Sequence, residues 1–94
     1  MEDNPGTLLD IGLEHHKAGR LVQAEKCYRE VLTYNPHDAE ALHLLGLAAH
    51  HGGRNEQAIR FIAKAIENDQ SNVKYINNLG IVYIALNKKE NATK

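Results

Sequence analysis

Residues of the same kind recur along this chain at a fixed interval of 34 residues. The turn pair Gly19-Arg20 recurs as Gly53-Arg54, and large apolar residues keep the same interval at positions 8, 42 and 76. The small residues that keep it are Gly12, Gly46 and Gly80, then Ala24, Ala58 and Ala92. A period of this length is typical of stacked repeats, in which each unit buries its apolar face only against its neighbours. The period therefore restricts the chain to a repeat architecture.

Each unit has the pattern of two helices joined by a turn. Apolar residues recur three and four positions apart, as one face of a helix requires, over residues 7–19, 21–36, 39–51, 56–68 and 73–86. Gly52-Gly53 is expected to stop the third helix and Asn87 the fifth, so that residues from about 89 to 94 begin a sixth. The expected N-caps are Asp38, Asn55 and either Ser71 or Asn72. No segment alternates like a half-buried strand, so the predicted fold class is all-α.

The adjacent histidines His50 and His51 raise the question of a metal or catalytic site just ahead of Gly52. They fill the last turn of the third helix, as His16 and Lys17 do in the first unit. Unpaired carbonyls and the negative end of the helix dipole favour such side chains there by ~0.3–1 kcal/mol each. The pattern indicates a helix end rather than a reactive site.

The composition is that of an ordinary folded protein without a strong charge. The chain has 94 residues, of which 43% are hydrophobic, and a formal net charge of −1. This balance offers no basic surface for nucleic acid or an anionic membrane, and no apolar run approaches the ~20 residues of a membrane span. Residues 1–10 lack the basic and apolar regions of a signal peptide, and the lone Cys27 can form no internal disulfide. We expect one cytoplasmic domain over residues 1–94.

Each unit also carries the same set of large and small residues. The sets are Leu8, Ile11-Gly12, His15, Ala24, Tyr28, Val31 and Pro36; then Leu42, Leu45-Gly46, Ala49, Ala58, Ile62 and Ala65; then Ile76, Leu79-Gly80, Tyr83 and Ala92. This order resembles the tetratricopeptide repeat family, although His15 and Ala49 replace the usual aromatic residue and Gln70 replaces the second Pro. The resemblance implies a right-handed superhelical solenoid with two full repeats, about residues 5–38 and 39–72, and an incomplete third, 73–94.

In that family the first helices of successive repeats line a concave groove that holds peptides or partner proteins. The resemblance therefore implies a non-catalytic scaffold for a protein or peptide partner of unknown identity. The groove positions carried onto this chain are Leu9, Asp10, Leu13, His16 and Lys17; then Glu40, His43, Leu44, Leu47, His50 and His51; then Lys74, Asn77, Asn78, Ile81 and Ile84.

Two binding modes known in the family can be compared with these positions. A chaperone-type carboxylate clamp would need Lys and Asn where Leu9 and Leu13 stand, and only Lys74 fits it. An asparagine ladder, as in bacterial-type repeats similar to O-linked N-acetylglucosamine transferase, would need Asn one residue before each Leu-Gly pair. Asn78 alone meets this requirement, because the equivalent positions hold an aspartate and a leucine. The clamp is absent, and only one of the three asparagines that a ladder would need is present.

The histidines and Cys27 do not form a recognisable reactive set. His43 and His50 are seven residues apart, about two helical turns or roughly 10.5 Å, and lack the spacing of a helical metal-binding pair. Cys27 belongs to the second helix of its unit and has no evident base beside it. We therefore expect no metal, no other cofactor, no catalytic residue and no enzymatic activity.

The first helix of the third unit is rich in apolar residues, but the helix that would cover it is incomplete. Leu79, Tyr83 and Leu86 are accordingly expected to be exposed or covered by another chain. This leaves two alternatives to a peptide scaffold. One is a homodimeric, helix-swapped or otherwise self-associating module, and the other is a piece of a larger repeat protein, such as the N-terminal part of a repeat-containing enzyme.

Overall fold

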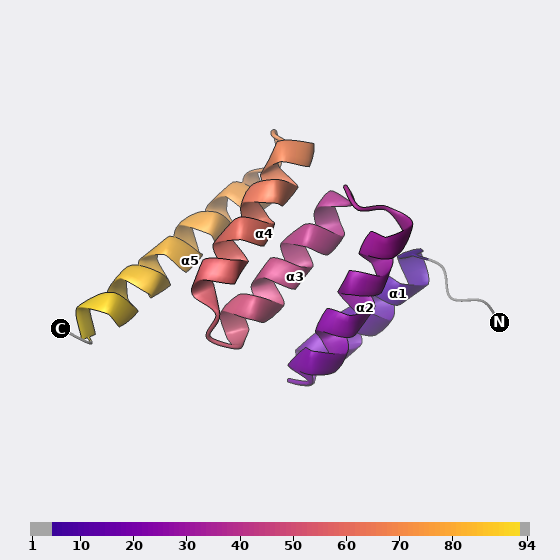
Figure 1. Ribbon diagram of the computed structural model, residues 1–94, viewed down its shortest axis with the longest axis horizontal. Coiled ribbons are helices and arrows are strands. Elements are labelled where there is room, and N and C mark those ends of the chain that lie inside the picture. Colours follow the sequence, from indigo (N-terminus) through magenta and orange to yellow (C-terminus); the bar gives the residue numbers. More distant parts are fainter. Residues whose placement is uncertain (1–4, 93–94) are drawn as a thin grey trace.

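The computed structural model describes residues 5–92, which form five α-helices arranged in a row, with α1 and α5 at opposite ends (Figure 1). The helices are α1 (Pro5–Lys17), α2 (Leu21–Tyr34), α3 (Ala39–His51), α4 (Asn55–Asn68) and α5 (Val73–Ala92). Each helix packs on the next, and α3 also contacts α5. The expected all-α repeat solenoid is confirmed, and no strand occurs between residues 5 and 92.

The two turns that close the first two units have the same backbone geometry. Gly19 and Gly53 have φ values of +81° and +83°, in the left-handed region that glycine enters without steric cost. The following amides reach back over the helix end, with Arg20 N donating to His15 O at 2.9 Å and Arg54 N to Ala49 O at 2.8 Å. This closes each first helix with the hydrogen bond of a Schellman cap.

The third unit has no such turn, which corrects the expected break at Asn87. Helix α5 is 20 residues long and continues through Asn87 to Ala92, whereas α1 and α3 have 13 residues each. Where the first two units have a glycine, this unit has an asparagine, and no non-glycine residue of the described chain adopts a positive φ. A straight helix keeps its internal hydrogen bonds and avoids that strain. Residues 93–94 of the expected sixth helix lie outside the described residues.

Two of the three expected N-caps are found. The Asp38 carboxylate accepts the Ala41 amide hydrogen bond at 2.9 Å, and the Asn72 side-chain oxygen accepts from the Tyr75 amide at 3.3 Å. Asn55 does not cap α4, because it is the first helical residue and its side chain is buried against His50.

Gly12 and Gly46 of the 34-residue period lie where the two helices of their units pack closely together. A Cβ atom on Gly12 would lie 2.6 Å from Tyr28 Cε1, and one on Gly46 would lie 2.6 Å from Ile62 Cγ1. The same atom on Gly80 would meet nothing within 4 Å. The glycines therefore allow close helix packing in the first two units, and in the third the corresponding space is open.

Candidate functional site

A concavity of about 640 Å³ opens between the first helices of the three units. It is lined by Thr7, Leu9, Asp10 and Leu13 of α1, Glu40 and Leu44 of α3, and Lys74 of α5. All of these except Thr7 are predicted groove residues. We call this concavity the groove.

The groove combines an apolar wall with two carboxylates. Leu9, Leu13 and Leu44 supply the apolar part, and Asp10 and Glu40 the acidic part. Asp10 is exposed to solvent. Lys74 of α5 adds one positive charge to the lining, and its Nζ lies 3.7 Å from Glu40 Oε2. The lining therefore carries two carboxylates and one ammonium group.

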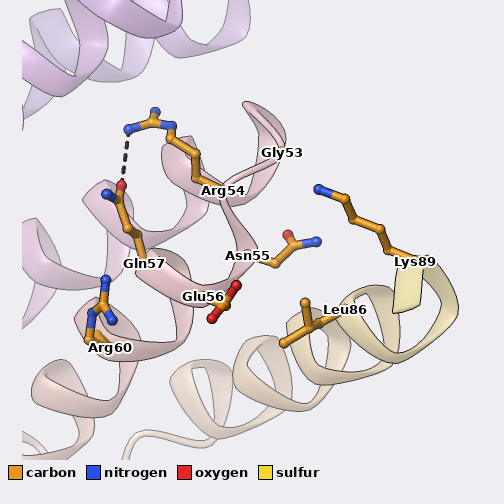
Figure 2. A pocket seen from close by; sticks show the side chains of 8 residues that line it. All are labelled: Gly53, Arg54, Asn55, Glu56, Gln57, Arg60, Leu86 and Lys89. Carbon is orange, nitrogen blue, oxygen red and sulfur yellow. Dashed lines mark hydrogen bonds between the residues drawn. The ribbon is translucent and has the colours of Figure 1, made fainter. Parts of the chain in front are cut away.

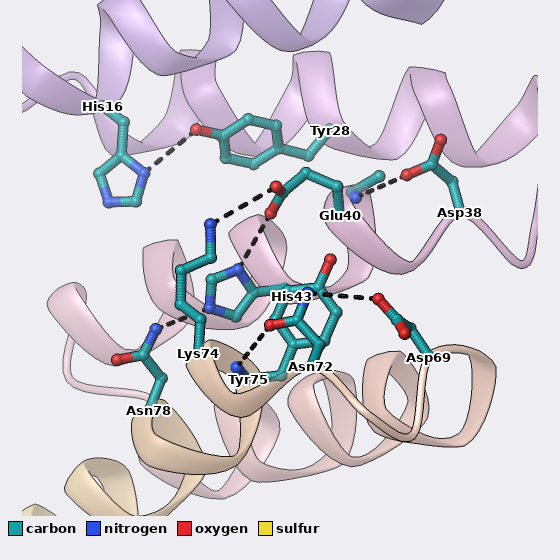
Figure 3. A network of polar contacts seen from close by, with 11 residues as sticks. His16, Tyr28, Asp38, Glu40, His43, Asp69, Asn72, Lys74, Tyr75 and Asn78 are labelled. Atoms are coloured by element: carbon teal, nitrogen blue, oxygen red, sulfur yellow. Dashed lines mark hydrogen bonds and ion pairs between the residues drawn. The ribbon is translucent and has the colours of Figure 1, made fainter.

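Glu40 is held in place from below by His43 (Figure 3). His43 Nδ1 lies 3.1 Å from Glu40 Oε1, and the Asn78 side-chain amide donates to His43 Nε2 at 2.8 Å. Because Nε2 accepts, the ring proton is on Nδ1 and is donated to the carboxylate. This hydrogen bond holds the pKa of Glu40 below its usual range, and the charge of Lys74 lowers it further against the opposing effect of burial. Glu40 is therefore an oriented, ionised group.

His43 itself is not a groove residue, which corrects the sequence prediction. The residue is only 1% exposed, and its ring packs on Tyr75 with centroids 4.5 Å apart. A residue so buried cannot contact a partner directly. It positions Glu40 and joins α3 to α5. Asn78, the ladder position, is half-buried and already uses one N–H on this ring.

A second polar bridge joins α1 to α3. His16 Nε2 lies 2.8 Å from His51 Nδ1, and His16 Nδ1 lies 3.1 Å from the Tyr28 hydroxyl. Burial, followed by the charge of its neighbour His51, lowers the pKa of His16, and burial followed by His50 lowers that of His51. Both shifts favour the neutral form of the ring. The two bridging pairs, His16–His51 and His43–Asn78, each span 35 residues, one more than the repeat period, so each links a residue of one first helix to the residue that follows its equivalent on the next.

His50 faces away from the groove, which is a second correction. Its Nδ1 lies 2.6 Å from the Asn55 side-chain oxygen on α4. It is thus part of the contact between the two helices of its own unit. Ile84, one period later, is 58% exposed and does not line the groove. The interpretation of His50 and His51 as the end of α3 is confirmed.

The chain shares these features with known helical-repeat proteins. The sequence profile of the tetratricopeptide repeat matches residues 9–73. The chain belongs to the tetratricopeptide repeat family. Among curated proteins, two proteins named "Cellulose synthase operon protein C" from Komagataeibacter xylinus are 38% identical over 64 residues and 33% identical over 67 residues. These matches cover 68% and 71% of this chain, which spans about 5% of the length of either relative.

Solved structures of this repeat class superpose closely. The first TPR of Spaghetti (RPAP3), solved with the HSP90 peptide SRMEEVD, has a TM-score of 0.85 at 21% identity, covering 95% of this chain and 72% of that one. MamA protein has a TM-score of 0.79 at 25% identity, covering 88% of this chain and 45% of that one. These likenesses establish the tetratricopeptide repeat fold. The finer resemblance to transferase-type repeats stays a prediction.

The remaining predicted residues of this tetratricopeptide repeat chain do not line the groove. Leu47 is half-buried in the core between units, and the exposed ones are Lys17, Asn77 and Ile81. Of the three residues expected to be exposed for self-association, only Tyr83 is, at 54%. Leu79 is partly buried against the core of the second unit, and Leu86 is also half-buried, because both lie on the side of α5 that packs on α4.

A polar hollow of about 360 Å³ between the start of α4 and the end of α5 was not anticipated (Figure 2). Its lining includes Arg54, Glu56, Leu86 and Lys89. The Arg54 guanidinium donates to Gln57 at 3.2 Å and forms an ion pair with Glu25. The only feature of the hollow that stands out in the sequence is Arg54, which recurs from Arg20. That recurrence predicts the turn before α4 and not a hollow.

No group of three or more His, Cys, Asp or Glu side chains among residues 5–92 is placed to hold a metal ion. Cys27 is half-buried on α2. None of the five described helices is both long and apolar enough to cross a membrane.

Proposed function

We propose that this chain is a non-catalytic scaffold that holds a segment of a partner protein in the groove between α1, α3 and α5. Tetratricopeptide repeat domains generally mediate protein–protein interaction, which is the coarse function of the chain. The observation that carries the specific proposal is the meeting of three leucines with an oriented carboxylate in one concavity. Apolar walls with a few placed polar groups are the usual composition of a binding site. A cytoplasmic location remains part of this proposal.

The partner segment that fits this groove carries apolar side chains and a cationic group. Leu9, Leu13 and Leu44 offer the apolar contact. Asp10 and Glu40 together carry one more negative charge than Lys74 balances. The first TPR of Spaghetti was solved with an acidic peptide, which would meet carboxylates here. Charge complementarity acts mainly on partner choice and association rate, so we propose a preference for basic over acidic segments.

The proposal is tested with two fluorescein-labelled peptides that share leucines at the same positions and carry either arginine or glutamate elsewhere. The arginine peptide is expected to bind about tenfold more tightly by fluorescence anisotropy. Asp10→Asn should weaken it about threefold, as the loss of one exposed ion pair does, and Leu13→Ala should weaken both peptides. Glu14→Gln is the matched control, because Glu14 is an exposed acid one turn further along α1 and does not line the groove.

If neither peptide binds, the proposal that the groove is a peptide-binding site is wrong. Equal binding of both, or equal effects of Asp10→Asn and Glu14→Gln, would leave a groove without the proposed charge preference.

A further inference from the structure

Each unit has one glycine in the middle of its first helix, and we call the space beside that glycine, where a Cβ atom would point, its seat. The seats of the three units differ in one respect. In the first unit Tyr28 of α2 lies over Gly12, and in the second Ile62 of α4 lies over Gly46. No described atom lies over Gly80 within 4 Å of an added Cβ. A large apolar side chain on a glycine is therefore the pattern by which this protein packs two helices, and one seat is empty.

The residues around Gly80 are exposed although their counterparts one period earlier are buried. Ile76 is 48% exposed where Leu42 is 5% exposed, and Tyr83 is 54% exposed where Ala49 is fully buried. Ile84 is 58% exposed. Large apolar residues grouped on one helix face are the usual mark of an interaction surface.

This face of α5 is also uncharged along its length. Its residues follow one another at three- and four-residue spacing, as neighbours on one side of a helix do. They are Val73, Ile76, Asn77, Gly80, Tyr83, Ile84 and Asn87. We call this set the α5 face. Charged residues make up 24% of the chain, and none belongs to this set, so two copies of it can meet without like-charge repulsion.

We propose that the α5 face binds the α5 face of a second copy of this chain, with the two helices antiparallel about a two-fold axis. In such a pair each Gly80 receives Ile84 or Tyr83 of the other copy, as Gly46 receives Ile62 within the chain. A two-fold contact uses the same patch on both copies and must be complementary to itself. The α5 face meets this condition, because it carries both the seat and the side chain that fills it. Its two asparagines supply donors and acceptors on both sides.

The size of the face sets the expected strength. Residues 73–87 extend for about 21 Å along the helix, and one helix face offers less than the ~800 Å² per partner of a stable interface. We therefore expect a reversible dimer that dissociates on dilution. The proposal does not depend on the groove, which lies on another side of α5 and can fail or succeed separately.

The test is sedimentation velocity of the 94-residue chain from micromolar to millimolar concentration, with helicity checked by circular dichroism. The unsubstituted chain should change from monomer to dimer across this range. Ile84→Lys should remain monomeric at every concentration, because it places two like charges in the contact. Val22→Lys is the matched control: Val22 is 66% exposed on α2, and this variant should dimerise like the unsubstituted chain.

A second variant keeps the test valid if Ile84→Lys loses structure. An added Cβ at Gly80 meets no described atom within 4 Å, and Gly80→Gln replaces glycine by a better helix former, so the monomer should stay folded while the seat is filled. Loss of the dimer in a folded Gly80→Gln variant supports the proposal. A monomer at all concentrations, or a dimer that survives both α5 variants, overturns it.

Discussion

Helices α3 and α5 hold equivalent positions in successive units, yet their environments differ. In α3 eight of 13 residues are buried, whereas in α5 only Tyr75 and Val82 are buried among 20 residues. The apolar pattern is alike, since Leu42, Leu45 and Gly46 correspond to Ile76, Leu79 and Gly80. The difference comes from neighbours: α3 packs on α2 and α4, and α5 packs mainly on α4. In a solenoid a helix carries the pattern for burial, and adjacent helices decide which of its faces become core.

The largest effect that would test this comparison is expected at the glycine of the second unit. In Gly46→Ala the new Cβ would lie 2.6 Å from Ile62 Cγ1 and 3.1 Å from the Ala58 backbone oxygen. Helices α3 and α4 would have to separate, which should lower the free energy of unfolding by about 2 kcal/mol. Urea denaturation at low protein concentration measures it. An unchanged midpoint would mean that the helices are not as closely packed as described.

A smaller effect is expected at the bridge between α3 and α5. Asn78→Ala removes the donor to His43 Nε2 and leaves a buried ring nitrogen unpaired, which should cost about 1–2 kcal/mol. The adjacent exposed Asn77→Ala is the control and should stay within about 0.5 kcal/mol. Equal effects of the two in urea denaturation would show that the bridge does not hold α5.

Glycine-to-alanine substitution should stabilise the third unit, although it destabilises the second. Gly80→Ala meets no described atom within 4 Å and removes the helical cost of glycine. It should raise the free energy of unfolding by roughly 0.5–1 kcal/mol at concentrations where the chain is monomeric. A loss of stability comparable with that of Gly46→Ala would mean that the seat over Gly80 is filled within a single chain.

The smallest expected effect is a pH dependence of the α1–α3 bridge. Unfolded histidines take up protons near pH 6.5, whereas His16 and His51 have lowered pKa values in the folded chain. The unfolded state therefore binds more protons as the pH falls below about 6.5, and stability falls with it. Thermal unfolding at pH 7.5 and 5.5 should show a lower Tm at the acidic pH. His16→Gln with His51→Gln should reduce this difference, and an unchanged difference would assign it to other groups.

Much of the fold could be predicted because its signals are local. Gly19 and Gly53 mark turns through their positive φ values, and Asp38 caps α3 through a hydrogen bond three residues away. The break predicted at Asn87 was wrong, since asparagine only tolerates the conformation that glycine favours and a continuous helix competes with it.

The candidate site could be predicted in part. Family positions brought Leu9, Leu13 and Leu44 to one concavity, because the side of a helix on which a residue lies follows from its register. The partners of polar side chains do not follow from register. His43 and His50 were placed on the groove, yet each turns to a hydrogen-bonding partner on another helix, Asn78 and Asn55.

The sequence by itself determined the repeat, its helices and the close approach of α3 to α4, since a 34-residue period with glycine and alanine in register leaves few other ways to bury the apolar faces. Only the tertiary structure decided that α5 continues past Asn87, that His43 lies beneath Glu40, and that the seat over Gly80 is open. The last two features depend on which helices lie beside one another and on competition among several polar partners, and neither is a property of local sequence. The continuation of α5 depends on the competition between a continuous helix and the left-handed conformation that asparagine only tolerates.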